Sequence, residues 1–151
     1  MLAYRLPREP STPRITVWRK LRRLGVVQLA DGVVGLPLDS RTHEALEWIA
    51  DEVIEAGGDS SIWIGEPTSA GHERALAERM AAAVAAEYAA VITAASAARE
   101  AEVRSRTRTL ARLRRELHRI RRRDYFPPAE RERADAAIAD LAASLNAEVA
   151  A

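Results

Sequence analysis

The sequence predicts an α+β fold, and three observations support this prediction. Short β-branched runs alternate with two helix-like segments in the first 67 residues, and long alanine- and leucine-patterned helices follow. Hydrophobic residues make up 48% of the 151 residues and charged residues 30%, which is enough apolar material for a packed interior. The chain contains no Cys, so disulfides, thiolate metal sites and a cysteine nucleophile are excluded.

The N-terminal segment predicts one strand and one helix. Residues 2–6 form a short apolar strand, which a turn-rich, proline-containing stretch stops. The helix begins at Ser11 or Thr12, because either side chain can cap its first turn. It ends at about Leu24, since Gly25 readily adopts the left-handed conformation that terminates helices.

An antiparallel hairpin, a second helix and a fourth strand complete the first unit. The hairpin pairs residues 26–29 with residues 33–36 across an Asp-Gly turn. The second helix begins at Asp39 and ends before Gly57, and residues 60–64 form the last strand. The order β-α-β-β-α-β is that of the split βαβ, ferredoxin-like plan, a four-stranded antiparallel sheet with two helices on one face. The other face needs cover, from later helices or from a second copy.

The second helix is expected to be amphipathic, with an apolar and an acidic face. The apolar face holds Leu46, Ile49, Ala50, Val53 and Ile54. The acidic face holds Glu44, Glu47, Asp51 and Glu55, for which a solvated face is a simpler interpretation than a metal site. The residues Trp18, Trp48 and Trp63 are expected more often in the core than at a ligand, with a position on the exposed side of the sheet or against a partner chain as the alternative for Trp63.

Two or three long helices are expected after the sheet, so the predicted units are residues 1–67 and residues 68–151, the second packed on the first. An alanine-rich helix spans 69–103, and a helix with a leucine seam spans about 107–123. The chain is expected to turn between residues 103 and 107, although one continuous helix remains an alternative. A last helix starts near Ala129, after two prolines.

Charge is balanced in total but strongly segregated along the chain. Lys and Arg number 23 against 22 Asp and Glu, yet residues 104–123 carry ten basic groups and one acidic group. Five arginines on the predicted leucine-seamed helix repeat over about 14 residues, roughly 21 Å, which suits a phosphate backbone. The candidate nucleic-acid-binding residues are Arg19, Arg22, Arg23, Arg108, Arg112, Arg115, Arg119 and Arg122. The equally weighted alternative is a solvated face, or pairing with Glu73, Glu78, Glu87, Glu100 and Glu102.

Nothing in the sequence predicts a catalytic or metal site. The three histidines, His43, His72 and His118, lack metal-ligand spacing, and no glycine-rich loop opens a helix. We therefore expect no catalytic residue, no metal and no cofactor, and a protein that is not an enzyme. No apolar run approaches the roughly 18 residues of a membrane span, so we expect a cytoplasmic protein without a membrane partner.

Several short motifs spread over nearly the whole chain carry a family resemblance. They are Leu6-Pro7-Arg8-Glu9-Pro10-Ser11, Val17-Trp18-Arg19-Lys20-Leu21, Asp31-Gly32-Val33 and Ile120-Arg121-Arg122-Arg123-Asp124-Tyr125-Phe126. The sequence thereby resembles the N-terminal domain of ChrB, the chromate-resistance regulator. The resemblance implies a bacterial cytoplasmic protein that takes part in transcriptional control of a chromate-efflux operon, and hence DNA binding. ChrB proteins continue into a C-terminal domain that is absent after Ala151, so a separately encoded ChrB C-terminal-like protein is a candidate partner.

The resemblance leaves further hypotheses open. Chromate is a tetrahedral dianion, and Arg8 and Arg14 near the start of the first helix are candidate ligands for it or another oxyanion. The main alternative to DNA binding is a protein interaction or oligomerisation module, in which the long helices bind a second copy as a dimer or larger homo-oligomer. A metal-dependent nuclease is a more distant alternative, disfavoured because Glu9 is the nearest acid to the end of the first strand.

Overall fold

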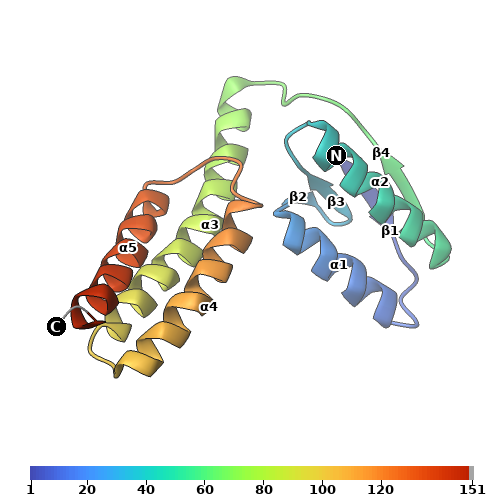
Figure 1. Ribbon diagram of the computed structural model, residues 1–151. Coiled ribbons are helices and arrows are strands. Elements are labelled where there is room, and N and C mark those ends of the chain that lie inside the picture. Colours follow the sequence, from blue (N-terminus) through green and yellow to red (C-terminus); the bar gives the residue numbers. More distant parts are fainter. Residues whose placement is uncertain (150–151) are drawn as a thin grey trace. The chain divides into compact units, whose positions relative to one another are not determined.

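A computed structural model describes residues 1–149 of the chain, with side chains described through residue 147. The chain forms two compact units, Met1–Met80 and a second unit from Ala81 onward, and each is described by itself. The division falls within one long helix, α3 (Ala70–Ala98), because the core residues of this helix all lie in its second half. Figure 1 labels the elements of both units.

The first unit contains a four-stranded antiparallel sheet and two helices (Figure 1). The strands lie in the order β2-β3-β1-β4. Strand β3 therefore lies between β1 and β2, which α1 connects, and β1 lies between β3 and β4, which α2 connects. This sheet and the long helices after it confirm the predicted α+β class. The elements are β1 (Leu2–Arg5), α1 (Thr12–Leu24), β2 (Val27–Ala30), β3 (Val33–Gly35), α2 (Ser40–Glu55) and β4 (Asp59–Ile62).

The core of the first unit and the caps at Gly25 and Asp39 follow the sequence pattern, whereas the predicted side-chain cap at the start of α1 is wrong, because Ser11 is helical there and makes no capping hydrogen bond. Helix α1 ends at Gly25, whose φ of 79° is left-handed, and Asp39 caps α2 by accepting a hydrogen bond from the Thr42 backbone N–H at 2.7 Å. Alternate strand residues pack against both helices, because successive side chains of a strand point to opposite faces. The core consists of Leu2, Val17, Leu21, Val34, Leu46, Ile49, Ala50 and Val53.

Several apolar residues of the first unit are more exposed than the sequence pattern predicts. Trp18 is 38% exposed and Trp48 67%, so the expectation of a core position is wrong for both, whereas Trp63 is 60% exposed, in line with the predicted alternative of an exposed position. Ile54, expected on the buried face of α2, is 54% exposed, because it lies at the edge of this face, about 80–100° around the helix from Leu46 and Val53. The last strand also ends at Ile62, two residues earlier than predicted.

The second unit is a bundle of three helices around one apolar core. It combines the second half of α3 with α4 (Val103–Arg121) and α5 (Glu130–Val149). Its core residues are Val84, Tyr88, Val91, Ala95, Ala98, Leu110, Leu113, Leu117, Ile120, Ala134, Ile138 and Leu141.

The connection between α3 and α4 differs from the predicted one. It lies at residues 99–102, before the expected turn at 103–107, and the alternative of one continuous helix is wrong. Glu102 adopts an extended ψ of 148°, which stops helical hydrogen bonding and begins α4 at the next residue.

Helix α3 also corrects the prediction that no apolar run has the length of a membrane span. Residues Ala70–Ala98 reach a mean hydropathy of 1.5 over an 18-residue window, of which 22% is buried. Alanine supplies much of this apolar length, and the core helix of a bundle meets the same criterion. The finding is therefore weak evidence for a membrane span.

We expect Gly32→Ala to destabilise the first unit by about 3 kcal/mol. Gly32 has a φ of 71°, and a Cβ there would lie 2.5 Å from the Tyr4 carbonyl oxygen. Gly57→Ala is the control, because its φ is 79° but a Cβ would meet no atom within 4 Å, so only the left-handed penalty of about 1 kcal/mol applies. Urea unfolding followed by circular dichroism measures both; equal losses would contradict the close approach to β1.

Candidate functional site

Helix α4 separates an apolar side from a strongly basic side. Leu110, Leu113, Leu117 and Ile120 are buried in the bundle core, at 8%, 1%, 6% and 0% exposure. Since each helical residue advances by about 100°, six arginines fall within an arc of about 80° on the opposite side. We call this set the arginine face: Arg104, Arg108, Arg112, Arg115, Arg119 and Arg122.

The arginine face is longer than the sequence pattern predicts. Because α4 begins at Val103 rather than near residue 107, Arg104 joins the five predicted arginines. Arg104 and Arg122 are separated by 18 residue steps, which correspond to about 27 Å of helix. The signal that was missed is periodicity: Arg104 lies four residues before Arg108 and continues the same spacing.

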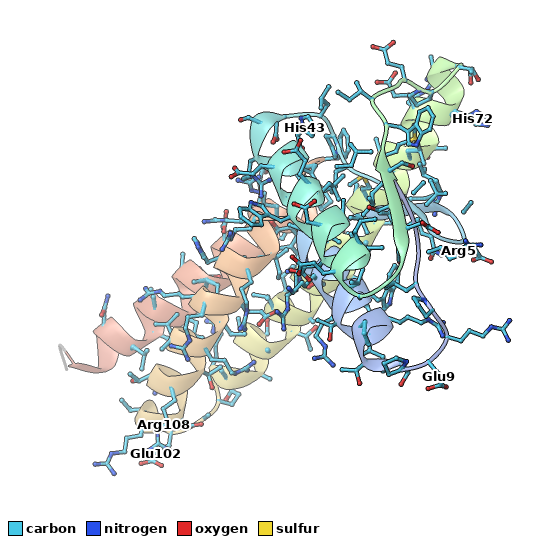
Figure 2. All side chains as sticks on the ribbon, turned by 90° about the vertical axis from the view of Figure 1, so that its right-hand side faces the viewer. Arg5, Glu9, His43, His72, Glu102 and Arg108 are labelled. Carbon is cyan, nitrogen blue, oxygen red and sulfur yellow. The ribbon has the colours of Figure 1, made fainter. Side chains whose placement is uncertain are left out.

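The arginine face is exposed and largely free of internal partners. All six side chains are exposed, and Arg108 extends outward from α4 in Figure 2. Arg119 pairs with Glu116 one turn earlier on the same helix. Within residues 1–147, the side chains of the other five make no ion pair or hydrogen bond.

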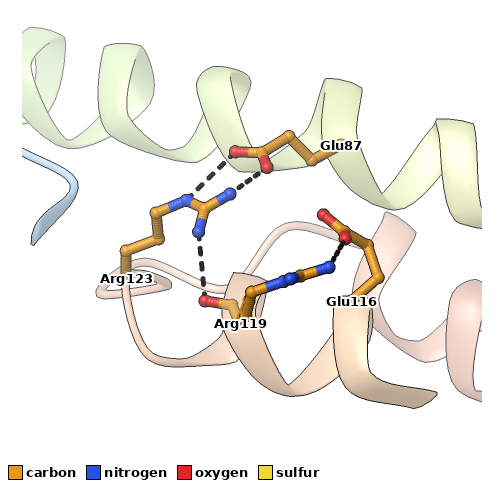
Figure 3. Close-up of polar contacts among 4 residues, drawn as sticks. All are labelled: Glu87, Glu116, Arg119 and Arg123. Carbon is orange, nitrogen blue, oxygen red and sulfur yellow. Dashed lines mark hydrogen bonds and ion pairs between the residues drawn. The ribbon is translucent and has the colours of Figure 1, made fainter. Parts of the chain in front are cut away.

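The predicted alternative is that the arginine face pairs with glutamates of the preceding helix. Among the described residues, no such ion pair is present. Of Glu73, Glu78, Glu87, Glu100 and Glu102, the glutamate with a described ion pair is Glu87. It binds Arg123, which lies after the end of α4, through Arg123 Nε at 3.2 Å and through Nη2 (Figure 3). Glu87 therefore holds a residue outside the arginine face.

The arginines of this region divide into two sets by their contacts. Arg121 pairs with Asp135 of α5, and the buried Arg106 donates a hydrogen bond to Ser144 Oγ at 3.4 Å. Together with Arg123 and Glu87, these contacts connect α4 and the residues just after it to both neighbouring helices. The arginine face is left to solvent.

Basic residues of α1 form a second exposed group, within the first unit. Arg19, Arg22 and Arg23 are exposed, and among the described residues their side chains have no ion pair. The ion pair between α1 and α2 is made by Lys20 and Glu52 instead. These arginines fall within about 100° of arc, so they also form one basic face.

The predicted oxyanion site at the start of α1 is open to solvent. Arg8, Arg14, Ser11 and Thr12 are all exposed, and Ser11 makes no side-chain capping hydrogen bond. The Ser11 hydroxyl is therefore not used as a helix cap. The four exposed residues do not form an enclosed binding site. Chromate binding there stays a prediction.

The described residues contain no group of three or more His, Asp or Glu side chains arranged to hold a metal ion. His43 and His72 lie on different helices of the first unit, and His118 lies on α4. The nuclease alternative therefore gains no observation from the described part of the chain.

A comparison with protein families identifies the domain. A family model described as "Protein ChrB, N-terminal" matches residues 14–149 of the 151-residue chain. The chain belongs to this ChrB N-terminal family. It is a ChrB-like chromate-resistance regulator domain, and the predicted family resemblance is confirmed. No curated protein and no solved structure matches the chain.

The ChrB N-terminal match includes both basic faces, since it begins at Arg14 and runs past the end of α4. Arg8 precedes the matched residues. The family match therefore covers most of α1, all of α2 and the helical bundle.

A buried tyrosine and aspartate anchor the end of α4 in this ChrB-like domain. The Tyr88 hydroxyl of α3 donates a hydrogen bond to Asp124 Oδ2 at 2.8 Å, and Arg131 Nη1 lies 3.5 Å from the same oxygen. The Asp124 side chain is 0% exposed. Burial, and then the hydrogen bond to Asp124, raise the pKa of Tyr88 well above its ordinary value.

We expect Tyr88→Phe to lower the free energy of unfolding by about 1–3 kcal/mol at pH 7, because it removes a hydrogen bond from a buried carboxylate. A raised folded-state pKa stabilises the fold below the unfolded pKa of about 10, and this contribution is lost as pH rises further. The wild type should therefore lose more stability than Y88F between about pH 9 and pH 11. Urea unfolding at both pH values measures the difference; parallel losses would contradict the assignment.

Proposed function

We propose that this ChrB-like domain binds double-stranded DNA through the arginine face of α4, as the DNA-contacting part of chromate-resistance regulation. The observation that carries the proposal is the row of five arginines without described partners along about 27 Å of helix. Guanidinium groups bind phosphate oxygens through paired, charge-assisted hydrogen bonds. A row of them is suited to a polyanion rather than to a single small anion.

The composition of α4 favours a duplex over a single strand. Proteins that bind single-stranded nucleic acid combine basic grooves with aromatic side chains on which the bases stack. Helix α4 contains no Trp, Tyr or Phe between Val103 and Arg121. Contacts to the phosphates of a duplex need no stacking side chain, so these arginines are suited to the outside of double-stranded DNA.

The arginine face supplies affinity rather than sequence recognition. Phosphate contacts position a protein on DNA and make its binding depend on salt, but they carry no direct sequence information. The α1 residues Arg19, Arg22 and Arg23 are a second basic face that can add phosphate contacts. In this proposal the domain works without catalysis, and its location is the bacterial cytoplasm, where chromosomal DNA is found.

We expect Arg112→Ala combined with Arg115→Ala to weaken binding to a duplex at least about tenfold at low salt. Each lost phosphate contact should also reduce the salt dependence of log K by about 0.9, so the slope should fall by about 2. Fluorescence anisotropy with a labelled duplex, titrated at several salt concentrations, measures both quantities.

The matched control is Arg74→Ala with Arg99→Ala, which removes the same charge from exposed arginines of α3 and its C-terminal turn. This control should retain the wild-type slope. No binding of the folded wild type at low salt would refute DNA binding. Because phosphate contacts carry no direct sequence information, the arginine face alone predicts similar affinity for a chromate-efflux promoter and for unrelated DNA, and a strong preference for the promoter would show that other residues contact the bases.

A further inference from the structure

Helix α2 exposes one large apolar side chain on each side of its acidic stripe. Trp48 is 67% exposed and lies opposite the buried Leu46 and Val53, and Ile54 is 54% exposed at the other edge of the stripe. We call the outward side of this helix the α2 face: Glu44, Glu47, Trp48, Asp51, Ile54 and Glu55. A large exposed aromatic side chain among charged residues is typical of a binding surface.

The carboxylates of the α2 face have almost no partners of their own. Within the part of the chain that the structure describes, Glu44, Asp51 and Glu55 make no ion pair, and Glu47 lies 3.4 Å from His43 Nε2. The contact with α1 is made by Glu52, which is outside this face. On the α2 face, most carboxylates therefore lack a described ion pair and the apolar side chains Trp48 and Ile54 are largely uncovered.

The chemistry of the α2 face is suited to a partner rich in arginine. A guanidinium group can bind a carboxylate and can also stack on the ring of a tryptophan, which an ammonium group does less well. The partner must carry several such groups at the spacing of the carboxylates. One surface of this same chain meets both conditions, namely the arginine face.

The two faces match in length and period. Glu44 and Glu55 are separated by 11 residue steps, and so are Arg108 and Arg119. Both sets are separated by steps of three and four residues and cover about 16 Å of helix. Two helices laid side by side could bring several opposite charges together at once.

We propose that the α2 face of one molecule binds the arginine face of a second copy. Such self-association would occupy the same arginines that the proposed function assigns to DNA, so the two would compete. Exposed ion pairs are individually weak, and the association is therefore weak and sensitive to salt. This proposal does not require DNA binding to be correct.

The first test is the mass of the wild-type protein in solution. By sedimentation equilibrium at low salt, the weight-average mass should rise above the 16.6 kDa of the monomer as protein concentration increases. In about 1 M salt, where the screening length is about 3 Å, it should return to the monomer value. A monomer mass at every concentration in low salt would refute the proposal.

Charge exchange between the two faces identifies the contact. One variant carries Glu47→Arg and Asp51→Arg, and the other carries Arg112→Glu and Arg115→Glu. Each variant alone should stay monomeric, because it presents faces of like charge. An equimolar mixture should associate again, because the α2 face of the second variant still matches the arginine face of the first. A folded mixture that stays monomeric would refute the proposal.

Two further variants separate the contact from general charge effects. Glu132→Arg with Asp140→Arg makes the same change of charge on exposed residues of α5 and should associate like the wild type. Trp48→Ala should weaken association several-fold with no change of charge. If the α5 variant lost association, the assigned faces would be wrong. The same holds if W48A associated as strongly as the wild type.

The outcome for DNA is measured separately. Glu47→Gln with Asp51→Asn should abolish self-association and leave duplex affinity at least at the wild-type value, since it leaves the arginine face intact. If the chain binds no DNA but the charge exchange succeeds, the proposed function fails and this inference stands. If the chain binds DNA but the charge exchange fails, the proposed function stands and this inference fails.

Discussion

Burial of the leucine seam of α4 is the constraint on which the basic surface of this protein depends. Leu113 and Ile120 are 1% and 0% exposed, and their burial sets the rotation of the helix about its own axis. Burying an aliphatic side chain of this size stabilises a fold by about 1.5–3 kcal/mol, whereas an exposed ion pair contributes about 0–1 kcal/mol. The apolar seam therefore decides which side of α4 faces inward, and the arginine face takes the position that is left.

Polar contacts then hold the C-terminal end of α4 and sort its arginines. The hydrogen bond between Tyr88 and Asp124 and the ion pair between Arg123 and Glu87 both connect α3 to the residues just after α4. These contacts pair Asp124 and Glu87 with groups outside the arginine face. A chain with nearly equal numbers of acidic and basic residues thus keeps a strongly basic surface, because its charges are segregated by helix and by side.

Segregated charge also gives the first unit an acidic surface that has no described partner. The exposed Trp48 among carboxylates on α2 and the arginines on α4 have opposite and complementary chemistry. In the two proposals the same arginines bind a polyanion or another copy of the chain, and salt weakens both interactions. Competition of this kind would link the oligomeric state to occupancy of DNA without any ligand-binding pocket.

The sequence by itself determined the order of the elements, the caps at Gly25 and Asp39, the leucine seam and the periodic arginines, because these depend on local spacing and on residue type. It did not determine where α3 ends, since alanine favours a continuous helix and the extended backbone of Glu102 is a feature of the folded chain. Only the tertiary structure decided that Glu87 pairs with Arg123. Periodicity gives the face of a helix, whereas the neighbours that cover this face come from distant segments of the chain.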